Sequence, residues 1–95
     1  MDNNYCSLFS QKQHENWINC ISFSKNKKML ASGSSDYTIK VWDLNTSYLI
    51  ETLKGHTHYV NTLAISQDCK YLVSGSSDKT IKIWDTNSWQ CIKTL

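Results

Sequence analysis

The sequence predicts an all-β fold made of two four-stranded antiparallel sheets. Three observations indicate this fold. A unit of about 42 residues occurs twice in the 95-residue chain. Each copy holds four short runs that are rich in Ile, Val, Thr and aromatic residues, as strands are. Asn, Asp, Ser and Lys separate the runs, and the chain contains no Pro, so no run is barred from a central place in a sheet.

The two copies align without a gap. Residues 14–53 match residues 56–95 at about 19 of 40 positions. The longest identical block, Ser-Gly-Ser-Ser-Asp, occupies Ser32–Asp36 in the first copy and Ser74–Asp78 in the second. Substitutions elsewhere mostly keep the chemical character, so both copies are expected to adopt one fold.

Four strands are expected in each copy, one for each run. In the first copy they are Ile18–Ser24, Met29–Ser34, Thr38–Asp43 and Tyr48–Leu53. In the second copy they are Val60–Ser66, Tyr71–Ser76, Thr80–Asp85 and Gln90–Leu95. The connections consist of residues that tolerate turn geometry or bond to their own backbone, and in the first copy they are Lys25–Lys28, Ser35–Tyr37 and Leu44–Ser47.

The repeats divide the chain into three parts. The first repeat is assigned to residues 14–53 and the second to residues 54–95. Residues 1–13 precede them, and the short mixed run Tyr5–Ser10 takes the place that Ser47–Thr52 holds before the second repeat. We therefore expect residues 1–13 to form a partial outer strand of a preceding unit or an N-terminal extension.

Composition argues against several classes of function. The net charge is only +2 and all ten basic residues are Lys, so the bidentate contacts that Arg makes with phosphate or guanine are absent. No apolar run reaches the roughly 18 residues of a membrane span, and the N-terminus lacks the features of a signal peptide. The four cysteines form no Cys-x-x-Cys pair. We therefore expect reduced thiols, no membrane partner and an intracellular location, cytoplasmic or nuclear.

One combination of motifs is specific. In each copy Trp-Asp begins six residues after the Asp of the Ser-Gly-Ser-Ser-Asp block, and Gly55-His56 opens the second copy. In these features, over about 80 of 95 residues, the chain resembles the WD-repeat β-propeller family. The first copy departs from the family pattern at Gln13, where Gly is preferred. The resemblance implies two blades of an incomplete ring and a protein–protein interaction scaffold without catalytic activity or cofactor.

The resemblance also implies a buried hydrogen-bond network in each blade. The members in the first blade are His14, Ser32, Asp36 and Trp42, and those in the second are His56, Ser74, Asp78 and Trp84. A buried polar group is costly unless it is hydrogen-bonded, so the four members of one blade are expected to act together.

Two other interpretations of these residues are weaker. Ser, His and Asp within reach of one another resemble a hydrolase triad, but the set recurs 42 residues later and no Gly-x-Ser-x-Gly motif is present. His56 and His58 have the His-x-His spacing of a metal site, but no third ligand is placed by spacing. The chain is therefore not expected to be an enzyme or to bind a metal.

Partners of the resembled family often dock on the face around the channel. Carried over to this chain, the partner-binding residues are Trp17, Asn19 and Ser35 in the first repeat and Tyr59, Asn61 and Ser77 in the second. The two aromatics stand at matched positions beside loops, where each can contribute about 2 kcal/mol to binding. Packing on neighbouring loops is the alternative for both aromatics, and the two serines have the alternative role of small turn residues.

Two blades cannot close a ring, because propellers usually have about four to eight. Val41, Trp42, Ile83 and Trp84 are expected on blade faces that need a neighbour, so two apolar faces would stay bare. Three accounts remain open. The chain is a fragment of a longer propeller, it assembles with copies of itself through exposed blade faces, or it stands alone as a weakly stable pair.

Two functions from different classes follow. The first is a protein-interaction scaffold whose partners are other proteins or peptides. The alternative is a nucleic-acid-binding module that uses Lys and exposed aromatics, and it rests on the mild Lys excess and four Trp residues. Nucleic-acid binding weakens steeply with salt, whereas an aromatic-anchored peptide site does not, so salt dependence separates the two.

Overall fold

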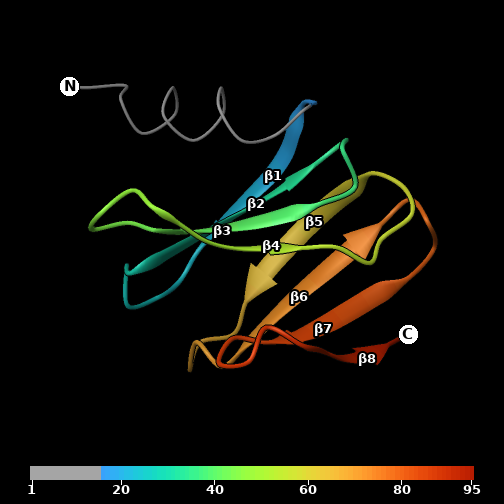
Figure 1. Cartoon of the computed structure of the whole chain (residues 1–95). Helices are drawn as coiled ribbons and strands as arrows, with labels where there is room; N and C mark the ends of the chain where they lie inside the picture. The colour runs from blue at the N-terminus through green and yellow to red at the C-terminus, as the bar shows by residue number, and fades with distance from the viewer. Residues whose placement is uncertain (1–15) are drawn as a thin grey trace.

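A computed structural model describes residues 16–95 as two four-stranded antiparallel sheets that lie against each other (Figure 1). The first sheet contains β1 (Ile18–Phe23), β2 (Met29–Ser34), β3 (Ile39–Asp43) and β4 (Leu49–Leu53). The second contains β5 (Val60–Ile65), β6 (Tyr71–Ser76), β7 (Ile81–Asp85) and β8 (Cys91–Thr94). In both sheets the strand order in space is the order along the chain. The prediction of an all-β chain with two four-stranded antiparallel blades is confirmed.

The predicted strands differ from the observed ones only at their ends. β2 and β6 have the predicted bounds, whereas β3 and β7 each begin one residue later than expected. The reason is local, because the amide of Thr38 donates to the Asp36 carboxylate at 2.9 Å within the turn that precedes β3. The predicted run Tyr5–Ser10 and the network residue His14 lie outside the described residues.

The turns are alike in the two sheets. Six non-glycine residues have a positive φ, and they form three equivalent pairs: Lys27 and Cys69, Tyr37 and Lys79, and Ser47 and Trp89. A left-handed backbone costs a non-glycine residue about 1–2 kcal/mol. Side chains at the turns offset this cost by accepting amide protons, as when Asp43 accepts the N–H of Asn45 at 2.8 Å.

Each sheet has two chemically different faces, which the strand register defines. We name them the Gly face and the Trp face. In the first sheet the Gly face carries Ala31, Gly33, Ile39, Val41 and Leu53, and the Trp face carries Ile18, Ile21, Phe23, Leu30, Ser32 and Trp42. In the second sheet the Gly face carries Val73, Gly75, Ile81, Ile83 and Leu95, and the Trp face carries Val60, Leu63, Ile65, Leu72, Ser74 and Trp84.

The main core lies between the sheets, where the Gly face of the first packs against the Trp face of the second. Ile39 and Val41 from one side and Leu72 and Trp84 from the other are buried in a single apolar cluster. The strand β5 lies against β1 and β2 (Figure 1). Burial of each large apolar side chain stabilises the fold by about 1.5–3 kcal/mol, so this contact fixes how the sheets sit together.

Val41, Trp42, Ile83 and Trp84 were expected on sheet faces that need a neighbour, and Val41 and Trp84 lie on the two faces that meet each other. Val41 and Trp84 are buried because they lie in the core between the sheets. Trp42 is also buried, in a smaller cluster with Leu30 and Leu44 on the Trp face of the first sheet. Ile83 alone is partly exposed, on the uncovered Gly face of the second sheet.

Gly33 allows the two sheets to approach closely. A Cβ atom at this position would lie 2.6 Å from Cγ1 of Val60 and 2.8 Å from Sγ of Cys20. Val60 is fully buried, and Cys20 packs against the core, so neither has free room to move away. A strand glycine often marks such a place where another backbone or side chain comes close.

Gly33→Ala should therefore lower the free energy of unfolding by about 1–3 kcal/mol, because the added methyl group overpacks the contact between the sheets. Gly75→Ala is the matched control, since its Cβ would meet only the side-chain Cγ2 of exposed Thr62 at 2.7 Å. Denaturant titration followed by tryptophan fluorescence at low micromolar concentration measures both variants. Equal losses for the two variants would contradict the close approach at Gly33.

Candidate protein-binding surface

The predicted partner-binding residues of the first repeat meet at one end of their sheet. β1 and β2 are antiparallel, so the start of β1 lies beside the end of β2. The amide of Ser35 donates to the carbonyl of Trp17 at 2.8 Å. The Asn19 side chain, at a bulge in β1, donates to Ser35 Oγ at 2.9 Å. These three residues form one hydrogen-bonded group.

The second repeat builds the same group. The amide of Ser77 donates to the carbonyl of Tyr59 at 2.9 Å, and Asn61 donates to Ser77 Oγ at 2.7 Å. Asn19 Nδ2 also lies 3.3 Å from the carbonyl oxygen of Val60 in the neighbouring sheet. The structure thus brings all six predicted residues together at the adjoining ends of the two sheets.

Aromatic rings gather at this end of the molecule. The Trp17 side chain is 81% exposed, which is inconsistent with packing on neighbouring loops. Tyr59 is 43% exposed and contacts the ring of His58 edge-on, with 4.5 Å between the ring centroids. The ring of Tyr37 stacks on His58 at 5.9 Å and lies 6.3 Å from that of Tyr59. Tyr59 therefore both packs on neighbouring rings and remains open to solvent.

Tyr37 and His58 were not among the predicted binding residues. Comparison of the two repeats could have identified Tyr37. Tyr37 and Lys79 occupy equivalent turn positions, and the first repeat has a large aromatic residue where the second has Lys. We call the eight residues at this end the aromatic rim, and they are Trp17, Asn19, Ser35, Tyr37, His58, Tyr59, Asn61 and Ser77.

A buried polar network lies beneath the rim in the second sheet. His56 Nδ1 is 2.9 Å from Asp78 Oδ2, and His56 Nε2 is 2.7 Å from Ser74 Oγ. The indole N–H of Trp84 donates to the same Ser74 oxygen at 3.0 Å. With its proton on Nδ1, His56 donates to the carboxylate and accepts from the Ser74 hydroxyl, which satisfies every partner. The four predicted network residues of the second repeat are therefore linked in one chain of hydrogen bonds, from Asp78 through His56 and Ser74 to Trp84.

The Asp78 carboxylate ties the network to the loops of the rim. It accepts the Thr80 hydroxyl at 2.5 Å, the Thr80 amide at 2.9 Å and the Thr57 amide at 3.1 Å. Burial raises the pKa of the Asp78 carboxyl, but the hydrogen bonds from Thr80, His56 and Thr57 together outweigh it and hold the pKa well below its usual range. The charged carboxylate thus fixes the loop that carries His58 and Tyr59.

The geometry of Ser74, His56 and Asp78 resembles that of a catalytic triad, but its surroundings differ. The Ser74 side chain is fully buried and already accepts the indole N–H of Trp84. No substrate carbonyl can reach a hydroxyl that is closed off in this way. Both ring nitrogens of His56 are engaged in hydrogen bonds, so neither is free to join His58 at a metal ion.

The first repeat shows the corresponding contacts for the residues that the structure describes. The indole N–H of Trp42 donates to Ser32 Oγ at 3.2 Å. The Thr38 hydroxyl donates to the Asp36 carboxylate at 2.6 Å, as the equivalent Thr80 does to its own Asp. His14 lies outside the described residues, so its place in the network stays a prediction.

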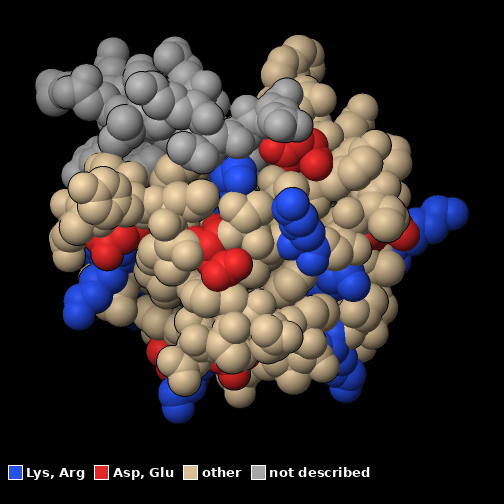
Figure 2. All heavy atoms as spheres, in the orientation of Figure 1, with Lys and Arg blue, Asp and Glu red and all other residues tan. Residues whose placement is uncertain are grey.

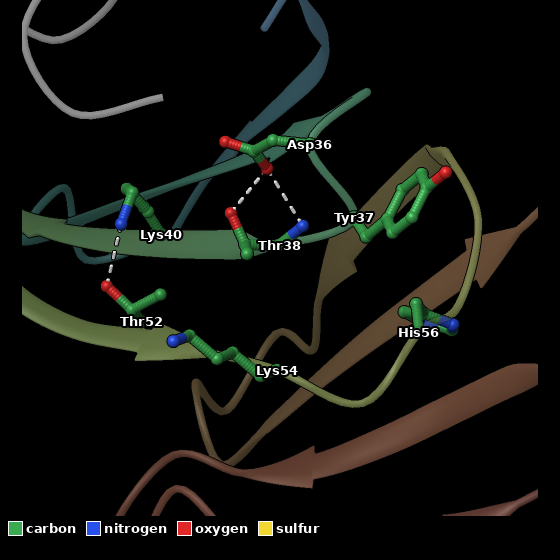
Figure 3. A pocket seen from close by; sticks show the side chains of 7 residues that line it. All are labelled: Asp36, Tyr37, Thr38, Lys40, Thr52, Lys54 and His56. Atoms are coloured by element: carbon green, nitrogen blue, oxygen red, sulfur yellow. Dashed lines mark hydrogen bonds between the residues drawn. The ribbon is translucent and has the colours of Figure 1, made fainter. Parts of the chain in front are cut away.

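A polar hollow of about 390 Å³ lies beside the rim (Figure 3). Its lining residues are Asp36, Tyr37, Thr38, Lys40, Thr52, Lys54 and His56. Lys40 Nζ donates to the Thr52 hydroxyl at 2.9 Å on one side, and Asp36 binds Thr38 on another. Two ammonium groups and one carboxylate suit this hollow to a polar or acidic group rather than an apolar one.

Charge does not gather into a patch of one sign on the face shown in Figure 2, where Lys and acidic residues alternate. Within residues 16–95 no helix is long and apolar enough to cross a membrane. The described part of the chain also holds no group of three or more His, Cys, Asp or Glu side chains arranged to bind a metal.

Comparison with known proteins identifies related sequences. The family model described as "WD domain, G-beta repeat" matches residues 5–43 and 47–85. A nuclear distribution protein PAC1 of Ajellomyces capsulatus is 49% identical over 47 residues, which are 50% of this chain and 10% of that protein. A guanine nucleotide-binding protein subunit beta-like protein of Encephalitozoon cuniculi is 44% identical over 46 residues, which are 47% of this chain and 14% of that protein.

Solved structures show the same fold. The structures titled "Structure of U3-55K" and "Crystal structure of RRP9 WD40 repeats" each superpose with a TM-score of 0.83 at 29% identity. Each comparison covers 86% of this chain and 25% of the solved chain. The chain therefore spans about a quarter of these structures and a smaller share of the curated relatives that it matches.

The low pKa of Asp78 predicts a stability that depends on pH. Since the folded-state pKa lies below the unfolded value of about 3.9, the carboxylate stabilises the fold above about pH 4, and this contribution is lost as the pH falls further. Asp78→Asn should lower the free energy of unfolding at pH 7 by about 2 kcal/mol and flatten its dependence on pH below 5. Thermal melts between pH 3 and pH 7 measure both effects.

Asp68→Asn provides the control for this experiment. Hydrogen bonds from the Ser66 hydroxyl and the Lys70 amide also lower the pKa of Asp68, but this carboxylate is exposed to solvent. Its replacement should leave most of the acid sensitivity in place. An Asp78→Asn variant that melts like the parent at every pH would show that the network does not hold the fold.

Proposed function

The chain belongs to the WD domain, G-beta repeat family, and we propose that it is a non-catalytic scaffold that binds other proteins or peptides at the aromatic rim. Repeats of this family generally mediate protein–protein interactions. The observation that carries the proposal for this chain is the exposed aromatic cluster at the joined ends of the two sheets. Trp17, Tyr37 and Tyr59 present open rings there, and all three are 43% exposed or more.

The rim is suited to binding because its aromatic residues stand on a rigid base. Asn19 and Asn61 each bond to a Ser of the adjoining turn, and the Asp78 network holds the loop before Tyr59. Pre-organised aromatics lose little conformational entropy on binding and contribute large contact areas. Such residues dominate the energetics of many protein interfaces.

The network supports a structural role rather than catalysis. Its serine is buried, and its histidine is held between two partners within the sheet. The related contacts in the first repeat, Trp42 with Ser32 and Thr38 with Asp36, favour the same role, since a chain has little use for one catalytic set per sheet.

We also propose an intracellular location, cytoplasmic or nuclear. The described cysteines Cys20, Cys69 and Cys91 are free thiols, the form that is typical of reducing compartments. The matched relatives include proteins named as nuclear distribution proteins, and the chain resembles each of them over about half of its own length.

Substitutions in the rim test the proposal. Trp17→Ser with Tyr59→Ser should reduce the capture of partner proteins from a cell extract by about tenfold or more, because each lost ring removes about 2 kcal/mol of binding. Tyr37→Gly removes a third ring and should also relieve its left-handed backbone, where φ is 77°. Quantitative mass spectrometry of the proteins captured by parent and variants gives the comparison.

Tyr48→Ser is the matched control, because Tyr48 is 75% exposed but precedes β4 at the opposite end of the first sheet. Its set of captured proteins should equal that of the parent. Equal capture by parent and rim variants would refute the rim as the binding surface. Binding of a labelled oligonucleotide that falls steeply with salt would favour the nucleic-acid alternative instead.

A further inference from the structure

The polar hollow and the aromatic rim share one residue, Tyr37 (Figure 3). Its ring lines the hollow and also stacks on His58 of the rim, with 5.9 Å between the ring centroids. His56 links the two surfaces a second time, because it lines the hollow and lies two residues before His58 in the chain. The hollow is therefore the next surface that a segment bound at the rim would meet.

The hollow contains two ammonium groups whose charges are not balanced by its carboxylate. Lys40 donates to the hydroxyl of Thr52 at 2.9 Å, and this acceptor is neutral. Lys54 is exposed and directly follows β4. The Asp36 carboxylate accepts the hydroxyl of Thr38 at 2.6 Å and its amide at 2.9 Å. In the described part of the chain neither lysine forms an ion pair with a carboxylate.

The second repeat shows which part of the hollow belongs to the fold. Lys82 donates to Thr94 at 3.0 Å, just as Lys40 donates to Thr52. A contact that occurs in both sheets is a structural feature of the repeat, so it does not mark a binding site by itself. Lys54 is different, because it lies in the connection between the sheets and its side chain extends toward Thr52 (Figure 3). It adds a second positive charge beside the one that the repeat already places there.

Two like charges gathered in a hollow favour an anion, which both ammonium groups attract. A carboxylate can accept charge-assisted hydrogen bonds from both of them, since its two oxygens offer several acceptor sites. The volume of about 390 Å³ suits one or two side chains rather than a folded element, because it is near the lower end of the roughly 300–1,000 Å³ of ligand pockets.

A nucleic acid fits this arrangement less well than a protein segment does. A chain of phosphates is bound by a stripe of basic residues. Lys and acidic residues alternate on the face shown in Figure 2, so no such stripe runs across it. A single acidic side chain needs only the two lysines of the hollow.

We propose that the hollow binds an acidic side chain, Asp or Glu, of the protein segment that lies on the aromatic rim. The inference rests on the proposed function, because the rim supplies most of the contact area and the hollow selects the acidic residue. Lys54 and Lys40 donate to the bound carboxylate, and Tyr37 lies between that carboxylate and the residues held at Trp17 and Tyr59. The partner is therefore an extended segment with an acidic residue close to its rim-binding part.

Selection of random peptides displayed on phage tests the proposal on the 95-residue chain. Peptides enriched by the parent should share Asp or Glu at one position, several-fold above the frequency in the unselected library. Lys54→Glu should remove this preference and keep the preferences at other positions. Lys25→Glu is the matched control, because Lys25 is exposed in the turn after β1, at the opposite end of the sheet, and its replacement changes the net charge equally. This control should select the same peptides as the parent.

A binding cycle with one enriched peptide measures the contact directly. Replacing the acidic residue of the peptide with its amide should weaken binding about fivefold to the parent, but less than about twofold to Lys54→Gln, because that variant already lacks the charge pair. Fluorescence anisotropy of the labelled peptide gives the four dissociation constants. Circular dichroism and thermal melts establish that Lys54→Gln folds like the parent, as expected for an exposed side chain.

The outcomes distinguish the hollow from the rim. Peptides that are lost with Trp17→Ser and Tyr59→Ser but share no acidic position would overturn the hollow and leave the rim in place. An acidic preference that survives in Lys54→Glu, or that is also lost in Lys25→Glu, would overturn it as well. Equal enrichment by the parent and the rim variant would refute the rim and the hollow together. An oligonucleotide that displaces the peptide and needs Lys54 to do so would assign the hollow to phosphate instead.

Discussion

The contact between the Gly face of the first sheet and the Trp face of the second supports the rest of the described structure. It buries Ile39 and Val41 against Leu72 and Trp84, and Gly33 lets the sheets come close enough for that packing. A four-stranded sheet with two partly apolar faces gains little from its own hydrogen bonds until one face is covered. The same contact brings β5 beside β1, which places the two halves of the rim next to each other.

The polar network acts on a smaller scale and depends on that burial. Ser74 and His56 are removed from water by the sheets and their loops, so each must find a protein partner, and the geometry provides one for every polar atom. The Asp78 carboxylate is the centre of this arrangement because it accepts hydrogen bonds from both the turn before β7 and the loop before β5. Stability and the position of the aromatic rim are therefore linked through one side chain.

The aromatic rim and the faces of the sheets are separate surfaces of the described structure. The rim uses residues at strand ends, where the left-handed turn at Tyr37 turns a large ring outward. The sheet faces use residues within the strands, where alternate side chains point to opposite sides. Binding at the rim, as proposed, would therefore leave the packing between the sheet faces unchanged.

The sequence alone determined the repeat and the eight strands, because both depend on local patterns that recur at a fixed spacing. The members of the second network came from the resemblance to a known family. The sequence also predicted the six rim residues, which the resemblance located at strand ends. It did not indicate that Tyr37 and His58 join them, since that contact crosses from one sheet to the other. Nor did it distinguish buried Ile39 from exposed Ile81. The two have the same neighbours in sequence, and only the tertiary structure, by covering one face and not the other, makes them different.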